Sequence, residues 1–141
     1  MSTHANNALH PTGLAQKLAD SGLRTTPQRE LVYDVLLTKR DHPTADEIFA
    51  RVKASMPTIS LATVYNTLRA FVEAGLINEV VVDGARSYFD TRMDDHPHFY
   101  WEDRAELTDA PADQLRISGL PDAPDGMQIS RVDVVIRLKR A

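Results

Sequence analysis

With 141 residues, 43% hydrophobic and 26% charged, the chain has room for one ordinary soluble domain or two small ones. It contains no cysteine, which excludes disulfides, thiolate-bound zinc and cysteine catalysis, so any metal must be bound by His, Asp, Glu or backbone oxygens. No apolar run approaches the roughly 20 residues of a membrane helix, and residues 1–10 lack the order of a signal peptide, so we expect a cytoplasmic protein with no membrane partner.

The formal net charge of −4 is unusual for a nucleic-acid-binding protein, but the acidic residues are concentrated near the C-terminus. Residues 1–40 carry five Lys/Arg against three Asp/Glu, whereas residues 91–141 carry seven against ten. The total charge therefore does not describe the N-terminal surface and does not exclude DNA binding there.

Four helices are expected in the N-terminal half. Thr26 followed by proline is typical of a helix start, and Thr44 with Glu47 forms a capping-box pattern. Gly22 suits a C-cap, and Pro57 ends the third helix because the residue before a proline is pushed out of helical geometry. With the apolar spacing, these signals predict helices over 11–22, 26–38, 44–56 and 60–75.

Strands are expected after the helices. Asp83-Gly84 between two β-rich runs predicts a hairpin, and the segment 110–127 is rich in Pro, Asp and Gly and indicates a loop with one helical turn at 112–116. The expected strands are 76–82, 85–90, 98–102, 106–109 and 129–138. The predicted fold is α+β, with an N-terminal winged helix-turn-helix domain (1–90), a hinge (91–95) and a small C-terminal α/β dimerisation domain (96–141). At about 50 residues the last part is too small to bury a good core alone, and a homodimer that shares sheet and core would solve this.

The fourth helix favours DNA binding over the alternative of any small helical domain with a terminal hairpin. At about 100° per residue its apolar side chains form one arc. Outside this arc, near the start of the helix, lie short polar groups, a small alanine and one aromatic side chain. Such groups can approach base edges and phosphates in a major groove. The apolar arc is Leu61, Val64, Leu68, Phe71 and Val72, and the expected DNA-binding residues are Ser60, Ala62, Thr63, Tyr65 and Asn66.

Three histidines and two aspartates suggest a metal site. His96 and His98 are two apart, so on a strand both point the same way. The alternative for each residue is a loop, turn or solvated role. The set has no soft ligand, which suits Fe(II), Mn(II) or Zn(II) and disfavours Cu(I). Because the candidates come from both halves, a bound metal would hold the two domains in one orientation and act as a switch. The candidate ligands are His42, Asp90, His96, His98 and Asp109.

These motifs together resemble the ferric uptake regulator (Fur) superfamily over nearly the whole chain. The segments that carry the resemblance are 18–29, 42–49, 60–68, 75–77, 88–90 and 95–98, and 60–68 is the most specific. The resemblance implies a dimeric, metal-responsive repressor or activator that binds a palindromic operator. It also implies that the five candidates are the regulatory metal ligands. Asp109, where many members have Glu, matches the peroxide-sensing branch (PerR), in which bound Fe(II) reacts with peroxide and a ligand histidine is oxidised.

The chain departs from the family pattern at the structural zinc. The first of the two expected cysteine pairs is replaced by Trp101 and Arg104, so a cysteine-ligated structural zinc is excluded.

The C-terminal part resembles most the iron response regulator (Irr) subgroup, whose members respond to haem. Haem binding through His96 or His98 is therefore possible, although the Cys-Pro haem motif is absent.

Three functions remain open at this stage. The first is an Irr-like regulator of iron homeostasis that senses iron or haem, and the second is a PerR-like peroxide sensor that uses Fe(II). The third is a non-haem iron enzyme with His96, His98 and Asp109 as its triad. A small C-terminal part leaves little room for a substrate pocket, so we expect that the protein is not an enzyme.

Overall fold

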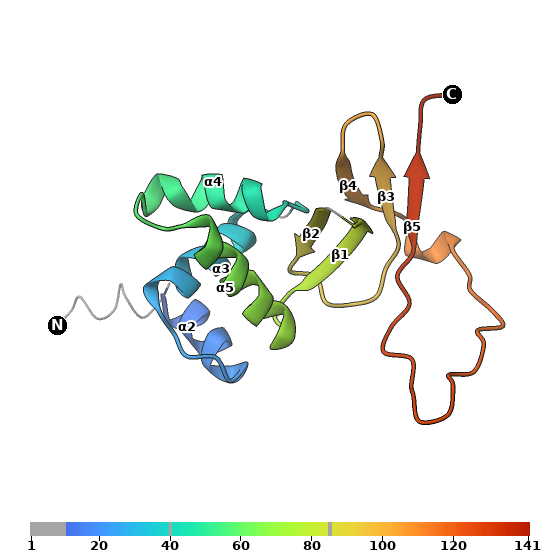
Figure 1. Cartoon of the computed structure of the whole chain (residues 1–141), viewed down its shortest axis with the longest axis horizontal. Coiled ribbons are helices and arrows are strands. Elements are labelled where there is room, and N and C mark those ends of the chain that lie inside the picture. Colours follow the sequence, from blue (N-terminus) through green and yellow to red (C-terminus); the bar gives the residue numbers. More distant parts are fainter. Residues whose placement is uncertain (1–10, 40, 85) are drawn as a thin grey trace. The chain divides into compact units, whose positions relative to one another are not determined.

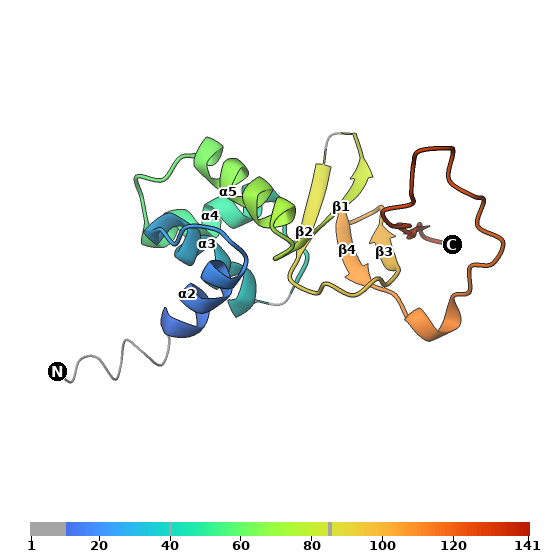
Figure 2. The same ribbon diagram turned by 90° about the horizontal axis from the view of Figure 1, so that it is seen from below.

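The computed structural model describes residues 11–39, 41–84 and 86–141, and the chain divides into two compact units, one up to Met93 and one from Asp94 onward. Among the described residues, the first unit contains four helices and a hairpin, and the second contains three strands and a short 3-10 helix (Figures 1 and 2). In the part of the chain that is described, no helix is long and apolar enough to span a membrane.

The helices of the first unit begin and end at the capping signals in the sequence. Thr26 accepts a hydrogen bond from the backbone of Arg29 at 3.2 Å, and Thr44 and Glu47 form the expected capping box. Gly22 and Gly75 adopt positive φ angles of 87° and 75° directly after helices, where glycine has no Cβ clash. The helices are α2 (Pro11–Asp20), α3 (Pro27–Thr38), α4 (Ala45–Ser55) and α5 (Leu61–Glu73).

The core of the first unit lies among these helices and one strand. Phe71 is fully buried, and its ring meets the ring of Tyr33 edge-on at a centroid distance of 5.7 Å. The expected apolar arc of α5 is confirmed for Val64, Leu68 and Phe71. It is wrong for Leu61, which is 37% exposed, because the core reaches α5 only from Val64 onward.

The expected hairpin is confirmed as β1 (Asn78–Asp83) and β2 (Arg86–Asp90), an antiparallel pair in which Asn78 lies opposite Asp90. Ala85, the expected first residue of the second strand, lies outside the described residues. The N–H of Phe89 donates to the carbonyl of Pro43 at 2.9 Å, and Thr44 forms a bridge with Tyr88. These bonds hold the segment that precedes α4 against β2.

The second unit is a three-stranded sheet in the order β4-β3-β5, in which β3 (His98–Trp101) lies between β4 (Glu106–Asp109) and β5 (Val135–Leu138) (Figure 1). The β3–β4 pair is antiparallel and the β3–β5 pair is parallel. The expected helical turn is present as η1 (Ala112–Gln114).

The expected strand over 129–138 is wrong in length, since only Val135–Leu138 is a strand. A strand needs a hydrogen-bonded partner. The partner of β5 is β3, which is four residues long, and their ladder begins at the pair His98 and Val135. Residues 129–134 are apolar enough for a strand, but β3 does not extend beside them.

Candidate functional site

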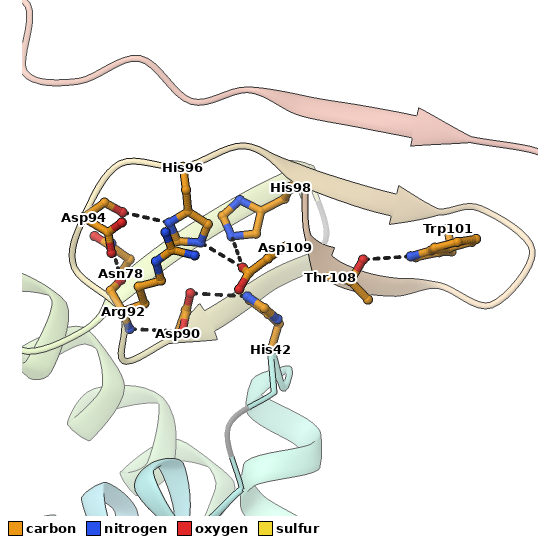
Figure 3. Close-up of polar contacts among 10 residues, drawn as sticks. All are labelled: His42, Asn78, Asp90, Arg92, Asp94, His96, His98, Trp101, Thr108 and Asp109. Atoms are coloured by element: carbon orange, nitrogen blue, oxygen red, sulfur yellow. Dashed lines mark hydrogen bonds and ion pairs between the residues drawn. The ribbon is translucent and has the colours of Figure 1, made fainter. Parts of the chain in front are cut away.

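His42 and Asp90 are the two members of the expected metal-binding set that lie in the first unit (Figure 3). His42 lies in the segment before α4 and Asp90 is the last residue of β2. The Nε2 atom of His42 is 3.2 Å from Oδ2 of Asp90. The bonds of Pro43 and Thr44 to β2 bring the two side chains together, because they place the residue before Pro43 beside the end of that strand.

The loop that carries His42 is also held from its other side. Arg51 on α4 makes two hydrogen bonds to the carboxylate of Asp41, at 3.2 Å and 2.8 Å. The hydrogen bond with Asp41 raises the pKa of Arg51 above its ordinary value. His42 therefore lies between two fixed points, the ion pair at Asp41 and the strand contact at Pro43.

The second carboxylate oxygen of Asp90 has a different partner (Figure 3). The Oδ1 atom accepts a hydrogen bond from the backbone N–H of Arg92 at 3.0 Å. The carbonyl of Arg92 in turn accepts a hydrogen bond from Nδ2 of Asn78 at 2.8 Å. The orientation of Asp90 is thus set by backbone contacts, as is common for carboxylates that bind metals.

In the second unit, His96, His98 and Asp109 form a compact group (Figure 3). The ladder between β3 and β4 pairs His98 directly with Asp109. The Oδ1 atom of Asp109 is 2.9 Å from Nε2 of His96 and 3.7 Å from Nε2 of His98. One potential ligand atom from each of the three residues lies within 4.8 Å of the others.

His96 reaches this group in a way that the sequence pattern did not predict. The expected strand start at His98 is confirmed, so His96 lies before β3 and the two histidines do not share a strand. The two rings nevertheless lie side by side, with centroids 4.4 Å apart. The Nδ1 atom of His96 is 2.8 Å from the carbonyl oxygen of Asp94. The carbonyl can only accept, so Nδ1 carries the N–H of this bond, and Nε2 is the ring atom that lies beside Oδ1 of Asp109.

This donor set fits a divalent metal. A metal-binding histidine usually donates its other ring N–H to a carbonyl or carboxylate, as the Asp94 carbonyl allows for His96. The group offers imidazole nitrogens and carboxylate oxygens, which suit Fe(II), Mn(II) and Zn(II). Each unit thus contributes a histidine–aspartate group, and metal binding by the five residues remains a prediction.

The expected DNA-binding residues lie on the first turns of α5. Ser60, Ala62, Tyr65 and Asn66 are exposed, and Thr63 is half-buried. The hydroxyl of Ser60 caps the helix, since it accepts a hydrogen bond from the N–H of Thr63 at 3.1 Å and lies 2.9 Å from that residue's hydroxyl. Tyr65, which is 45% exposed, is the largest group offered to a partner.

Two features beside the candidate site were missed by sequence reasoning. The partners Arg51 and Asp41 are ten residues apart, and Asn78 and Arg92 are fourteen apart. No spacing rule pairs residues at such separations across different elements. The turn of the hairpin was the one available signal. Counting back from it gives the register that pairs Asn78 with Asp90, and this would have placed Asn78 beside a candidate ligand.

The fold resembles a crystal structure of the Vibrio cholerae ferric uptake regulator, with a TM-score of 0.68 and 23% identity, over 89% of this chain and 98% of that one. A Pseudomonas aeruginosa ferric uptake regulator with manganese gives a TM-score of 0.67 at 21% identity, over 89% of this chain and 96% of that one. The described helices followed by a hairpin have the element order of a winged helix, and the fold is therefore a winged-helix unit followed by a second unit with a three-stranded sheet.

The family follows from the sequence matches. The model of the ferric uptake regulator family matches residues 20–123. The peroxide operon regulator of Bacillus subtilis is 39% identical over 94 residues, which are 67% of this chain and 65% of that protein. The aligned part thus spans just under two thirds of that relative. The chain belongs to the ferric uptake regulator family.

Proposed function

We propose that this protein is a metal-responsive transcriptional regulator that binds a palindromic DNA operator as a homodimer. Family membership and the exposed Tyr65 and Asn66 on α5 support this function. A homodimer would present two such helices to the two halves of a palindromic operator. Membership of a family of regulators favours this function over a non-haem iron enzyme, although the same residue types would serve either.

We propose further that His42, Asp90, His96, His98 and Asp109 bind one divalent metal together. The observation that carries this proposal is that each unit has its own pre-positioned histidine–aspartate group, His42 with Asp90 and His98 with Asp109. A metal that needs both groups favours the arrangement of the two units that brings them together. Metal occupancy would then change DNA affinity by a coupling between the two sites.

Replacement of His96 and His98 by alanine tests the metal site. Loss of two of five ligands should weaken Mn(II) binding by about 100-fold or more, judged by the effect of losing even outer-shell partners. Calorimetric titration measures the affinity, and operator binding before and after chelation measures the response. The control replaces His4 and His10, which lie outside the ligand set. A double variant with the normal metal response would remove these residues from the mechanism.

The physiological signal has two candidates. The Irr-like alternative, regulation of iron homeostasis through iron or haem, rests on the C-terminal sequence. The peroxide-sensing alternative is favoured by the 39% identity to a protein named peroxide operon regulator. It is also favoured by an aspartate at position 109.

Two exposures of the purified protein separate these candidates. A shift of the haem Soret band on titration, without oxidation of the protein, supports the Irr-like function. Treatment of the Fe(II)-loaded protein with peroxide, followed by peptide mass spectrometry, should show an added oxygen at His42 or His96 if the protein is a peroxide sensor. Unmodified histidines after complete loss of Fe(II) would count against that function.

A further inference from the structure

The carboxylate of Asp90 connects two features of the first unit. Its Oδ2 atom faces His42 at 3.2 Å, on the side of the candidate metal site. Its Oδ1 atom accepts the N–H of Arg92 at 3.0 Å. Arg92 belongs to the segment that leads out of the winged helix, one residue before the end of the first unit. One rigid planar group therefore contacts both a candidate ligand and the start of the connecting segment.

Asn78 holds the same segment from the neighbouring strand. Its Nδ2 atom donates to the carbonyl of Arg92 at 2.8 Å (Figure 3). Because β1 and β2 pair Asn78 directly with Asp90, the two side chains approach Arg92 from adjacent positions of one hairpin. We call Asn78, Asp90 and Arg92 the linker clamp. Both polar groups of the Arg92 backbone are bound within this clamp.

The clamp limits where the chain can bend between the units. Residues 91 and 92 follow the hairpin directly and are tied back to it, so they belong to the winged-helix unit. A joint that changes the arrangement of the units must then begin after Arg92, which agrees with the division of the chain between Met93 and Asp94. The sequence-based hinge over 91–95 would be shortened at its start.

We propose that Asn78 is a positioning residue that couples metal binding at Asp90 to the conformation of the connecting segment. This inference rests on the proposed function. The side chain of Asn78 binds the Arg92 carbonyl, and it acts by keeping the Arg92 N–H on Oδ1, so that Oδ2 stays directed at His42. When a metal binds Oδ2 and shifts the carboxylate, the connecting segment moves with it as long as the clamp holds. Without the clamp, the segment does not move with the carboxylate.

The test compares Asn78→Asp with Gln16→Glu. Both substitutions replace an amide that donates a 2.8 Å hydrogen bond by a carboxylate, and both add one negative charge to the same unit. Asn78→Ser is a second, uncharged variant. The DNA probe is a duplex selected from random sequence by the wild-type protein in the presence of Mn(II). The quantity measured is the ratio of the duplex Kd without Mn(II) to the Kd with Mn(II).

For Asn78→Asp we expect this ratio to move towards one by about twofold to tenfold, the equivalent of one side-chain hydrogen bond. By linkage, the effect of the duplex on Mn(II) affinity should shrink by the same factor. In the metal-free protein, hydrogen exchange of the Arg92 amide should accelerate by a similar factor, while Gln16→Glu leaves both quantities unchanged. A general loss of stability would accelerate exchange at amides throughout the unit, so the Arg92 rate is compared with the rates of the other amides, and thermal unfolding records the stability separately.

The outcomes separate the clamp from the proposed function. If the wild-type protein binds the duplex equally with and without Mn(II), the proposed function fails, and the Arg92 exchange rate still tests the clamp. If the wild type responds to Mn(II) and both Asn78 variants keep its full ratio and its Arg92 exchange rate, the clamp is wrong. If Asn78→Asp does not fold, Asn78→Ser decides by the same two measurements.

Discussion

The ion pair between Arg51 and Asp41 should stabilise the winged-helix unit and, through it, the position of His42. The perturbation is a double-mutant cycle with Arg51→Gln and Asp41→Asn. The two hydrogen bonds are 3.2 Å and 2.8 Å long, and the side chains are 26% and 33% exposed. Lys39 lies 3.7 Å from the same carboxylate and keeps a cation there when Arg51 is removed.

These observations bound the magnitude. Exposed pairs contribute about 0.2–1 kcal/mol to the free energy of unfolding, and hydrogen bonds to charged groups contribute about 1.5–3 kcal/mol. A half-buried, bidentate pair with partial solvent screening lies between these limits, so we expect a coupling energy of about 1 kcal/mol. For a unit of this size that energy corresponds to a change in Tm of about 4–8 °C.

Urea unfolding of the metal-free protein measures the coupling, and Mn(II) titration measures the consequence for His42. We expect Arg51→Gln to weaken Mn(II) binding by about threefold to tenfold, at or below the range for partners that orient metal ligands. The control is Arg140→Gln, whose partner Asp103 is 3.0 Å away but whose own side chain is 85% exposed. A coupling energy no larger than the effect of Arg140→Gln would refute the reasoning.

The pH dependence of this contribution follows from the pKa of Arg51. The hydrogen bond to Asp41 is the main cause that raises this pKa above its ordinary value. A cation with a raised pKa in the folded state stabilises the protein below the unfolded-state pKa, and this stability is lost only as pH rises through the folded-state value. Both values lie in the strongly alkaline range. The difference between wild type and Arg51→Gln should therefore stay constant between about pH 6 and pH 9 as far as Arg51 is concerned.

Three further predictions concern helix α5, which carries the expected DNA-binding residues, and the β3–β4 hairpin. Tyr65→Ala should weaken binding to a selected operator by about 10-fold to 100-fold, the equivalent of one base contact, with the dimer intact by sedimentation; an unchanged footprint would exclude α5 as the reading helix. Trp101→Phe should cost about 1 kcal/mol of stability, because the indole N–H donates to Thr108 at 2.9 Å and the Arg104 guanidinium lies 4.2 Å from the ring; no change on this substitution would mean that the hairpin is held elsewhere. Ala105→Gly should raise the stability by up to about 1 kcal/mol, since Ala105 has a φ of 50° and an L-residue is strained there. A lower Tm for this variant would mean that the wild-type protein does not carry this strain.

Much of the fold could be predicted because its signals are local. The capping box of Thr44 and Glu47 and the glycine after α5 act over three or four residues, so their geometry is the same in any context. The hairpin turn is equally local. The candidate ligands were found for a related reason, since histidine and aspartate at the ends of strands are recognisable one at a time.

The sequence by itself thus determined where the helices begin and end, where the hairpin turns, and which residues offer metal-binding atoms. Only the folded chain sets which side chains are buried, how long the strands are and which partners the residues contact. Burial of Leu61 depended on whether the core reaches the first turn of α5, and the length of β5 depended on the length of β3. The hydrogen bonds of Arg51 to Asp41 and of Asn78 to Arg92 join distant segments. Such contacts exist only after folding, because chain topology rather than sequence spacing brings their partners within hydrogen-bond distance.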